Sequence, residues 1–190
     1  MSSPEAGPPA SPTTETDRRT AVLDSALATF ARFGYRRTSM EEVARAAHIS
    51  RPGLYFLFSS KQALFRAAAA QALERDIAAV EHVLADAHRP LAERLVEAFD
   101  QWAGRYVGPL ARDVAVLIED NPDLLGELAL TAPRRFEELI TDAIAVASGQ
   151  ATATSRAQTM ISASIGLKHQ AATREFYLER LKAAVHLLVP

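Results

Sequence analysis

A short run of residues from position 50 to 56 has the side-chain types and the spacing of a surface that reads a nucleic acid. Ser50 can cap a helix and leave the amide-rich start of that helix facing a phosphate. Arg51 follows and can fork onto guanine O6 and N7. Gly53 keeps the helix surface low enough for a close approach, while Tyr55 and Phe56 supply a hydroxyl and an apolar edge. These types predict contact with double-stranded DNA.

Several of these residues also have an ordinary structural interpretation. Tyr55 could be a half-buried core tyrosine, and Arg51 could be a solvated surface arginine. Arg36 and Arg37, which add positive charge nearby, could form an ordinary charged junction between helices. Leu54 and Phe58 are expected in the core rather than in contact with DNA.

The elements that must position this run have the pattern of a helix-turn-helix. One helical face is predicted for Met40, Val43, Ala44 and Ala47. Either Thr38 or Ser39 caps that helix, with Glu41 or Glu42 completing a capping box. The small side chains on its inner face let a second helix pack closely, and Ile49 can plug the turn. In such a motif the second helix enters the major groove.

The remaining chain also repeats with a helical period. An initial helix carries Val22, Ala26, Phe30 and Phe33 on one face and can end at Gly34. Ser59 and Gln62 are expected to form a second capping box that opens a long helix with a stripe at Leu73, Ile77, Val80 and Leu84. Neither a convincing strand nor an internal repeat is present, so the sequence predicts an all-α fold.

Prolines divide the second half into further helices. Pro90 is expected to start a helix that carries Leu91, Leu95, Phe99, Trp102 and Tyr106 on one side. Pro109 allows another helix with Leu110, Val114 and Leu117, and Asn121-Pro122 breaks the chain before a helix through Leu124 and Leu128. Pro133 is expected to kink or restart that helix, because proline lacks an N–H and clashes with the preceding turn.

Composition narrows the class of protein. The 190 residues contain no cysteine, which excludes disulfides and thiolate metal sites. No apolar run reaches the roughly 18 residues of a membrane span, and the Ser-, Thr- and Pro-rich residues 1–16 are expected to be a disordered tail. Residues 17–66 hold nine Lys and Arg against four Asp and Glu, whereas residues 67–190 hold twelve against seventeen. This asymmetry favours a polyanion as the partner of the first section.

The segment from Phe33 to Leu64 resembles the DNA-binding head of the tetracycline-repressor (TetR) family. The positions that carry the resemblance are Phe33, Gly34, Thr38, Val43, Ala44, Ala46, Ala47, Ser50, Gly53, Tyr55, Phe58, Lys61 and Leu64. The resemblance implies a head at residues 17–62 and an effector-binding and dimerisation body at residues 63–190. The absence of cysteine fits a reducing cytosol, so we expect a cytoplasmic protein.

The same resemblance assigns residues to DNA. Thr38, Tyr55 and Lys61 would hold phosphates, while Arg51, Pro52, Gly53 and Phe56 would face bases. Ser39 and Ser50, at the starts of the two helices, complete the predicted DNA-binding set.

Two residues depart from the family pattern. His48 stands where the turn usually has glycine, and a positive φ there costs histidine up to about 1 kcal/mol more than glycine. Leu57 stands where histidine is common, so a phosphate or ring contact is expected to be missing.

In the TetR family the body binds a small molecule between its helices, and the last two helices pair two subunits. Candidates for lining a pocket for a small apolar or amphipathic effector are Phe99, Trp102, Tyr106, Phe136, Met160 and Phe176. An aromatic stripe at helical spacing is more often plain core. Small residues between Ser155 and Lys168 favour a homodimer seam, with close packing inside one subunit as the alternative.

The predicted function is a DNA-binding transcriptional regulator, a repressor released from operator DNA by a small-molecule effector. The alternative is an effector-independent or architectural DNA-binding protein. An enzyme is not predicted, because the sequence shows neither a nucleophile elbow nor a phosphate-binding glycine loop. Neither a cofactor nor a metal is predicted, since the five histidines form no i, i+4 pair.

Overall fold

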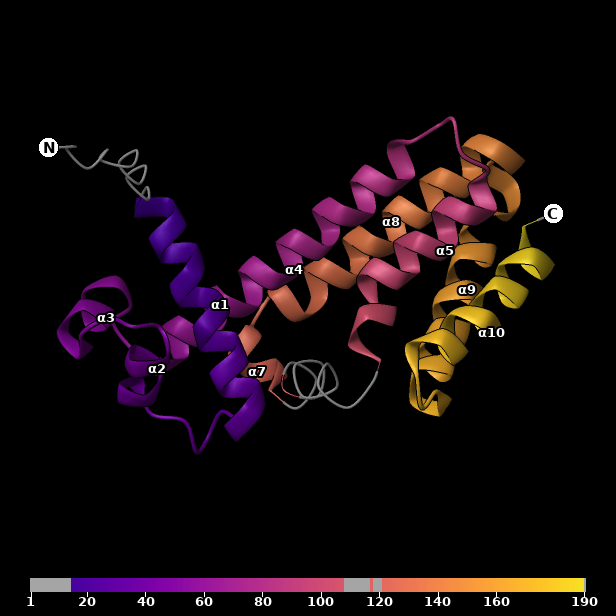
Figure 1. Ribbon diagram of the computed structural model, residues 1–190. Helices are drawn as coiled ribbons and strands as arrows, with labels where there is room; N and C mark the ends of the chain where they lie inside the picture. Colours follow the sequence, from indigo (N-terminus) through magenta and orange to yellow (C-terminus); the bar gives the residue numbers. More distant parts are fainter. Residues whose placement is uncertain (1–14, 108–116, 118–120, 190) are drawn as a thin grey trace, which may run out of the picture.

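The computed structural model describes residues 15–107, 117 and 121–189, and within these residues every regular element is a helix, as predicted (Figure 1). The first helices are α1 (Glu15–Phe33), α2 (Met40–Ala46), α3 (Arg51–Leu57) and α4 (Lys61–Ala85). They are followed by α5 (Leu91–Trp102), the short 3₁₀ helix η1 (Gly104–Tyr106), α7 (Pro122–Leu125), α8 (Leu128–Ser148), α9 (Gln150–Gln170) and α10 (Arg174–Leu188).

The starts of the short helices follow local sequence rules. The Ser39 side chain accepts a hydrogen bond from the Glu42 amide, and the Glu42 carboxylate accepts one from the Ser39 amide. This is the predicted capping box, with Ser39 rather than Thr38 as the cap. Ser50 caps α3, and Pro52 lies in its first turn, where its missing N–H costs nothing.

Three expectations about helix ends and faces were wrong. Ser60, not Ser59, caps α4, and its side chain accepts from the Ala63 amide, so no capping box with Gln62 forms. Phe33 is substantially exposed at the end of α1 instead of lining its buried face. α1 begins at Glu15, two residues inside the expected tail, while the rest of that tail lies outside the described residues.

Helix α4 belongs to both halves of the molecule. At about 1.5 Å per residue its 25 residues reach about 37 Å, and it runs from α1–α3 to the helices of the body (Figure 1). Its buried residues are Leu64, Phe65, Ala68, Ala69, Ala72, Asp76, Val80 and Val83. Of the predicted stripe only Val80 is fully buried, and Leu73, Ile77 and Leu84 are partly buried.

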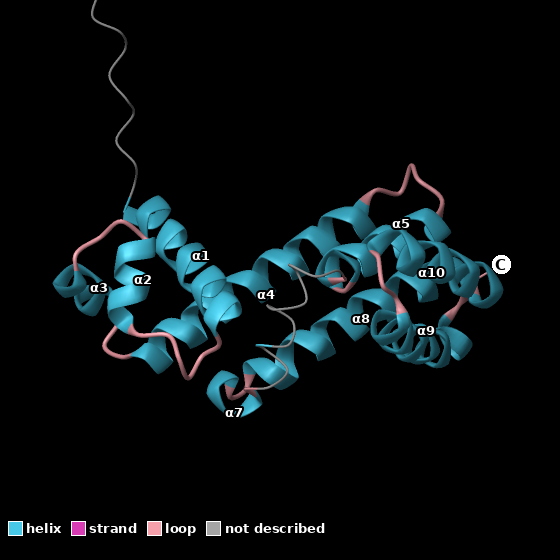
Figure 2. Cartoon of the chain, turned by 60° about the horizontal axis from the view of Figure 1, so that its bottom comes forward, coloured by secondary structure: helices cyan, strands magenta, loops and turns pink. Residues whose placement is uncertain are grey.

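Two separate hydrophobic cores follow from this arrangement. The head core joins α1–α3 and the first half of α4, and it also contains Leu117 and Leu125 from later in the chain. The body core joins the second half of α4 with α5, α8, α9 and α10. Figure 2 shows the two groups of helices at opposite ends of α4, with α8 beside its second half.

The body differs from the predicted helix limits in two places. α5 ends at Trp102, so Tyr106 lies in η1 and not on the same helix face as Phe99. Pro133 lies inside α8, which continues through it from Leu128, although a shorter helix α7 precedes it as expected after Asn121-Pro122. The helix predicted after Pro109 lies outside the described residues except for Leu117, which is buried.

Candidate functional site

Helix α3 presents the side chains that the sequence assigned to base contacts. Arg51, Pro52 and Tyr55 are exposed, and Phe56 is 88% exposed although it is a large apolar side chain. Leu54 and Phe58 are buried in the head core, as predicted. The helix therefore has one face that anchors it and one face that is available to a partner.

The first turn of α3 is built around its cap. The Gly53 amide donates to Ser50 Oγ over 3.1 Å, and a Cβ at Gly53 would lie 3.0 Å from that oxygen. Glycine at this position therefore protects the cap as well as keeping the surface low. The guanidinium of Arg51 lies 5.8 Å from the centre of the Tyr55 ring, so the two exposed side chains form one cationic and aromatic edge.

The turn between α2 and α3 has the predicted strain. His48 has a φ of 55°, the sole positive φ of a non-glycine residue among those described. Its amide donates to the Arg45 carbonyl over 3.2 Å, and the Ile49 amide donates to the Ala44 carbonyl over 3.0 Å. Ile49 and Leu57 pack against the head core from the turn side.

Two predicted phosphate ligands already have partners inside the head. The Lys61 ammonium donates to the carbonyls of Tyr35 and Thr38, each over 3.0 Å, and lies 4.6 Å from the Tyr35 ring centre. Thr38 is 1% exposed, and its hydroxyl donates to the Gly34 carbonyl over 2.9 Å. Lys61 thus ties the start of α4 to the α1–α2 connection, and a phosphate contact by either residue stays a prediction.

The sequence reasoning missed a groove beside α3. This groove has a volume of about 550 Å³ and lies between the start of α1 and the turn before α3. It is lined by Glu15, Arg18, Arg19, Val22, His48, Ile49, Ser50, Gly53, Phe56 and Leu57. Arg19 also lies over the Phe58 ring, 4.5 Å from its centre. The charge excess of residues 17–66 was a signal for these arginines, but it could not place them beside α3.

The body holds a second candidate site, an apolar cavity of about 390 Å³. Its walls are Leu73, Asp76, Phe99, Trp102, Ala103, Tyr106, Leu125, Leu128, Ala129, Pro133, Phe136, Ile161, Ser164, Ile165 and Lys168. Four of the predicted lining residues therefore meet there: Phe99, Trp102, Tyr106 and Phe136. Met160 is fully buried in the body core and Phe176 is 45% exposed, and neither lines this cavity.

Aromatic rings form one side of the cavity. Trp102 stacks on Phe136 with ring centres 4.9 Å apart and an interplanar angle of 10°. Phe99 meets the edge of the same Phe136 ring at 5.1 Å and 88°. These contacts hold the rings in fixed orientations, so the cavity has a defined planar wall.

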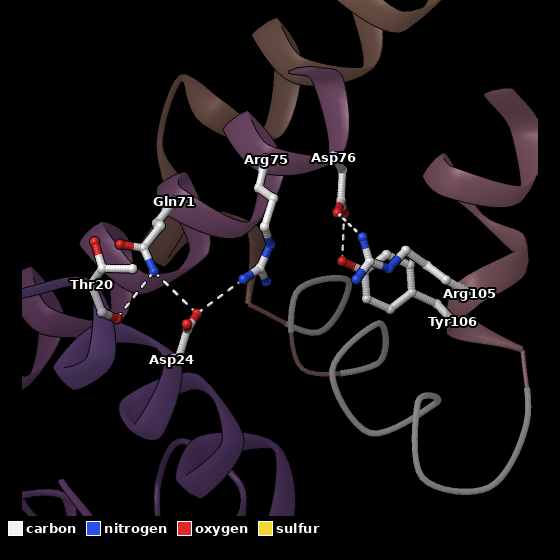
Figure 3. A network of polar contacts seen from close by, with 7 residues as sticks. All are labelled: Thr20, Asp24, Gln71, Arg75, Asp76, Arg105 and Tyr106. Atoms are coloured by element: carbon white, nitrogen blue, oxygen red, sulfur yellow. Dashed lines mark hydrogen bonds and ion pairs between the residues drawn. The ribbon is translucent and has the colours of Figure 1, made fainter. Parts of the chain in front are cut away.

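A buried carboxylate on α4 interrupts this apolar lining. Asp76 accepts hydrogen bonds from Arg105 Nη1 over 2.8 Å and from the Tyr106 hydroxyl (Figure 3). Burial raises the pKa of Asp76 above its ordinary value, while Tyr106 and Arg105 oppose that rise. Burial and the neighbouring Asp76 charge also raise the pKa of Tyr106, which therefore remains the hydrogen-bond donor.

The residue next to Asp76 points to the head instead. Arg75 Nη1 donates to Asp24 of α1 over 3.2 Å, and the Gln71 amide donates to Asp24 and to the Thr20 carbonyl (Figure 3). Consecutive positions of α4 thus contact the cavity wall and the first helix of the head. These α1–α4 contacts are exposed and are individually worth little stability.

The cavity and the head core also share residues. Leu125 is buried in the head core and lines the cavity, and Leu128 and Ala129 pack against that core while lining the cavity as well. Arg66 of α4 donates to the Leu124 carbonyl over 3.0 Å and holds α7 against the head. The α7–α8 junction therefore contacts both the cavity and the head core.

The small residues of α9 divide between two uses. Ala153, Ala157 and Ser164 are buried within the subunit, where α9 packs against α8 and α10. Gly166 has open space where a Cβ would stand, and Ile165, Phe176 and Leu187 are exposed on α9 and α10. Close packing inside one subunit therefore accounts for part of the pattern, and the dimer seam stays a prediction.

The described residues give no support to two other kinds of site. No group of three or more histidine, aspartate or glutamate side chains that could hold a metal ion occurs among them. No helix in this part of the chain is long and apolar enough to cross a membrane.

Known proteins resemble the head in sequence. The family described as "Bacterial regulatory proteins, tetR family" matches residues 22–68. The HTH-type transcriptional regulator RutR of Escherichia coli is 39% identical over 57 residues, which are 30% of this chain and 27% of RutR. The HTH-type nicotine-responsive transcriptional repressor HdnoR of Paenarthrobacter nicotinovorans is 26% identical over 136 residues, 70% of each chain. The chain thus matches only about a quarter of the length of RutR.

Solved structures resemble the whole fold. The crystal structure of a protein of Mesorhizobium loti, named as a putative TetR-family transcriptional regulator, superposes on the chain with a TM-score of 0.74. The two are 18% identical, and the superposition covers 92% of this chain and 96% of that one. The reduced form of NemR of Escherichia coli gives a TM-score of 0.74 at 17% identity, covering 92% and 98%. At this level of identity the likeness concerns the fold.

Proposed function

We propose that the chain, a member of the TetR family of bacterial regulatory proteins, binds operator DNA through α3. It is released from that DNA when a small molecule fills the body cavity. Residues 17–62 act as the DNA-binding head and residues 63–190 as the effector-binding and dimerisation body. The observation that carries the DNA-binding part is the exposed edge of α3, with Arg51, Tyr55 and Phe56 on a helix capped by Ser50.

The base-reading role of Arg51 is tested with a duplex selected from a random pool. Arg51→Ala is expected to cost roughly 1–3 kcal/mol and to relax the preference at one base pair in each half-site. Arg134→Ala, which removes an exposed arginine of α8, is the matched control and leaves selection unchanged. Unchanged base preference in Arg51→Ala would refute this role.

The phosphate-contacting roles are separated by salt dependence. Tyr55→Phe removes only the hydroxyl and weakens binding to all sequences alike. Lys61→Met is expected to lower the slope of log affinity against log salt by about one unit if its charge faces a phosphate. A preserved slope with lower thermal stability would instead restrict Lys61 to its carbonyl partners, Tyr35 and Thr38.

Release by an effector is supported by the place of the cavity. It is bounded by α4, whose opposite face contacts α1, and by the α7–α8 junction, which packs on the head core. A ligand that binds one arrangement of these elements better than the other shifts the spacing of two heads on DNA. A relative that is named for its response to nicotine supports the same use of a small molecule.

The coupling has a reciprocal test. A coupling of 1–3 kcal/mol changes operator affinity by about 5- to 150-fold, and operator DNA must weaken ligand binding by the same factor. Titration of a cavity ligand with and without the selected duplex measures both sides. Equal ligand affinities in the two titrations would remove the regulatory role and favour an effector-independent DNA-binding protein.

A homodimer through α9 and α10 is part of the proposal. Two-fold symmetry would place two α3 helices about one DNA turn apart on a near-palindromic site. Leu187→Asp puts a charge on an 83% exposed leucine of α10, away from the cavity, and is expected to give monomers with weak DNA binding. Leu130→Asp, which changes an exposed leucine of α8, is the control. Light scattering measures the mass of each variant, and a monomeric unmodified protein would refute the proposed dimer.

A further inference from the structure

One carboxylate stands in the apolar wall of the body cavity. Asp76 is 1% exposed and projects from α4 into a lining dominated by aromatic and aliphatic side chains. A buried carboxylate is costly unless opposite charge and hydrogen bonds compensate it. Its partners therefore determine what chemistry the cavity still lacks.

The compensation of Asp76 is incomplete. Arg105 reaches one oxygen through a single nitrogen at 2.8 Å, and Tyr106 donates to the other. A carboxylate offers about four acceptor positions, so each oxygen keeps the capacity for a further donor. The Arg105 side chain is 36% exposed, so water screens part of its charge. Burial remains the largest influence on the pKa of Asp76 and raises it despite both partners.

The surrounding rings suit a cation with a planar body. Trp102, stacked on Phe136, and Tyr106 both line the cavity that contains Asp76. Aromatic faces attract organic cations, and an aromatic ligand can continue the stack on the planar wall. A volume of about 390 Å³ is that of a site for a small organic molecule.

We propose that the cavity selects an aromatic amine in its protonated form, with the ammonium donating to Asp76 and the ring packing beside Trp102. This inference rests on the proposed use of the cavity as the effector site. Lys168 also lines the cavity and would be the partner of an anionic ligand, so the charge of the ligand decides between the two residues.

Three indole probes of similar shape test the charge preference by calorimetry: tryptamine as the cation, tryptophol as the neutral analogue and indole-3-propionate as the anion. Tryptamine is expected to bind at least about tenfold more tightly than tryptophol, the effect of one charge-assisted hydrogen bond. Asp76→Asn reduces that ratio to about twofold or less, whereas Glu74→Gln, which changes an exposed carboxylate of the same helix, preserves it.

A second variant keeps the test decisive if Asp76→Asn folds poorly. Arg105→Met removes the competing cation from a partly exposed position and is expected to tighten tryptamine binding severalfold while leaving tryptophol unchanged. Equal affinity of tryptamine and tryptophol overturns the inference. Preferential binding of indole-3-propionate that is lost in Lys168→Met also overturns it.

Operator release separates this inference from the proposed function. If tryptophol binds and releases the selected duplex as well as tryptamine does, the cavity is regulatory but not selective for amines. If tryptamine binds with the Asp76-dependent preference and leaves the duplex bound, the amine site stands and regulated release fails.

Discussion

The two cores of the molecule satisfy their buried polar groups over different distances along the chain. In the head the Thr29 hydroxyl donates to the Ser25 carbonyl and the Thr38 hydroxyl to the Gly34 carbonyl, each four residues away. In the body Asp76 is held by Arg105 and Tyr106, 29 and 30 residues away. Two further body contacts join Asp100 to Arg174 and Ser164 to Tyr177 across 74 and 13 residues.

This difference shows where each region acquires its precision. The head takes most of its local geometry from caps and turns, with Lys61 adding longer bonds to the Tyr35 and Thr38 carbonyls, 26 and 23 residues away. The body depends on contacts between distant helices, and one of its buried carboxylates, Asp76, lines a cavity. A region that depends on such contacts is the one in which a ligand can change the arrangement of helices.

The largest expected effect tests whether the two cores unfold independently. Phe65→Ala in the head core and Phe99→Ala in the body core each remove a fully buried ring and should cost about 3–5 kcal/mol. Because α4 contributes to both cores, both variants are expected to lose the whole structure in one transition.

The single tryptophan makes this measurable. Trp102 fluorescence reports on the body alone, and far-ultraviolet circular dichroism reports on all helices. The two signals should coincide during denaturant unfolding of each variant. If Phe65→Ala lowered the helix signal while Trp102 kept its native midpoint, the cores would be separate cooperative units.

A smaller effect is expected where the long-range contacts of the body converge. A Cβ on Gly104 would contact the Asp100 carboxylate and lie 2.9 Å from Tyr177 Cε1, so Gly104→Ala should cost about 1–3 kcal/mol by overpacking. Gly166→Ala is the control, since nothing lies within 4 Å of its Cβ position in the subunit, and should stabilise α9 by about 0.5–1 kcal/mol. Thermal unfolding measures both, and a neutral Gly104→Ala would show that η1 shifts freely.

Removing a local cap in the head should cost less. Ser39→Ala removes the hydroxyl that accepts from the Glu42 amide but leaves the bond from the residue 39 amide to the Glu42 carboxylate, and it is expected to lower the free energy of unfolding by about 1 kcal/mol. Hydrogen bonds from the Ser39 amide and then from its hydroxyl hold the pKa of the Glu42 carboxylate below its ordinary value. Only the bond from the hydroxyl to that carboxylate is lost in Ser39→Ala, so this part of the wild-type advantage should fade as the pH drops through the lowered pKa. Unfolding at neutral and acidic pH checks this, and an advantage of the same size at both pH values would contradict it.

The smallest expected effect is a gain in stability. His48→Gly relieves the positive φ of 55° in the turn and should stabilise the head by up to about 1 kcal/mol, offset partly by the larger freedom of glycine in the unfolded chain. Ala47→Gly, next to it with a φ of −84°, is the control and should destabilise. Denaturant midpoints at constant slope give the comparison; a loss in His48→Gly would show that the imidazole itself stabilises the turn.

What the sequence determined by itself is the all-α fold and most of the head. Capping residues, apolar spacing and turn residues act within four positions, so Ser50 and His48 could be assigned from the chain alone, and the cap of α2 could be narrowed to Thr38 or Ser39. The sequence could not decide which of two adjacent serines caps α4, because both offer the same hydroxyl; Ser60 is the cap where Ser59 was expected.

Tertiary structure alone decided the cavity. Phe99, Trp102 and Tyr106 were recognisable as aromatic side chains at helical spacing, but nothing in that spacing told which candidates from other helices would join them. Phe136 lines the cavity, whereas Met160 lies in the core and Phe176 at the surface. Asp76 gave no signal, because an aspartate in a long helix is ordinarily solvated. Its burial depends on η1, which brings Arg105 and Tyr106 to it from 29 and 30 residues further along the chain, a distance that no local pattern encodes.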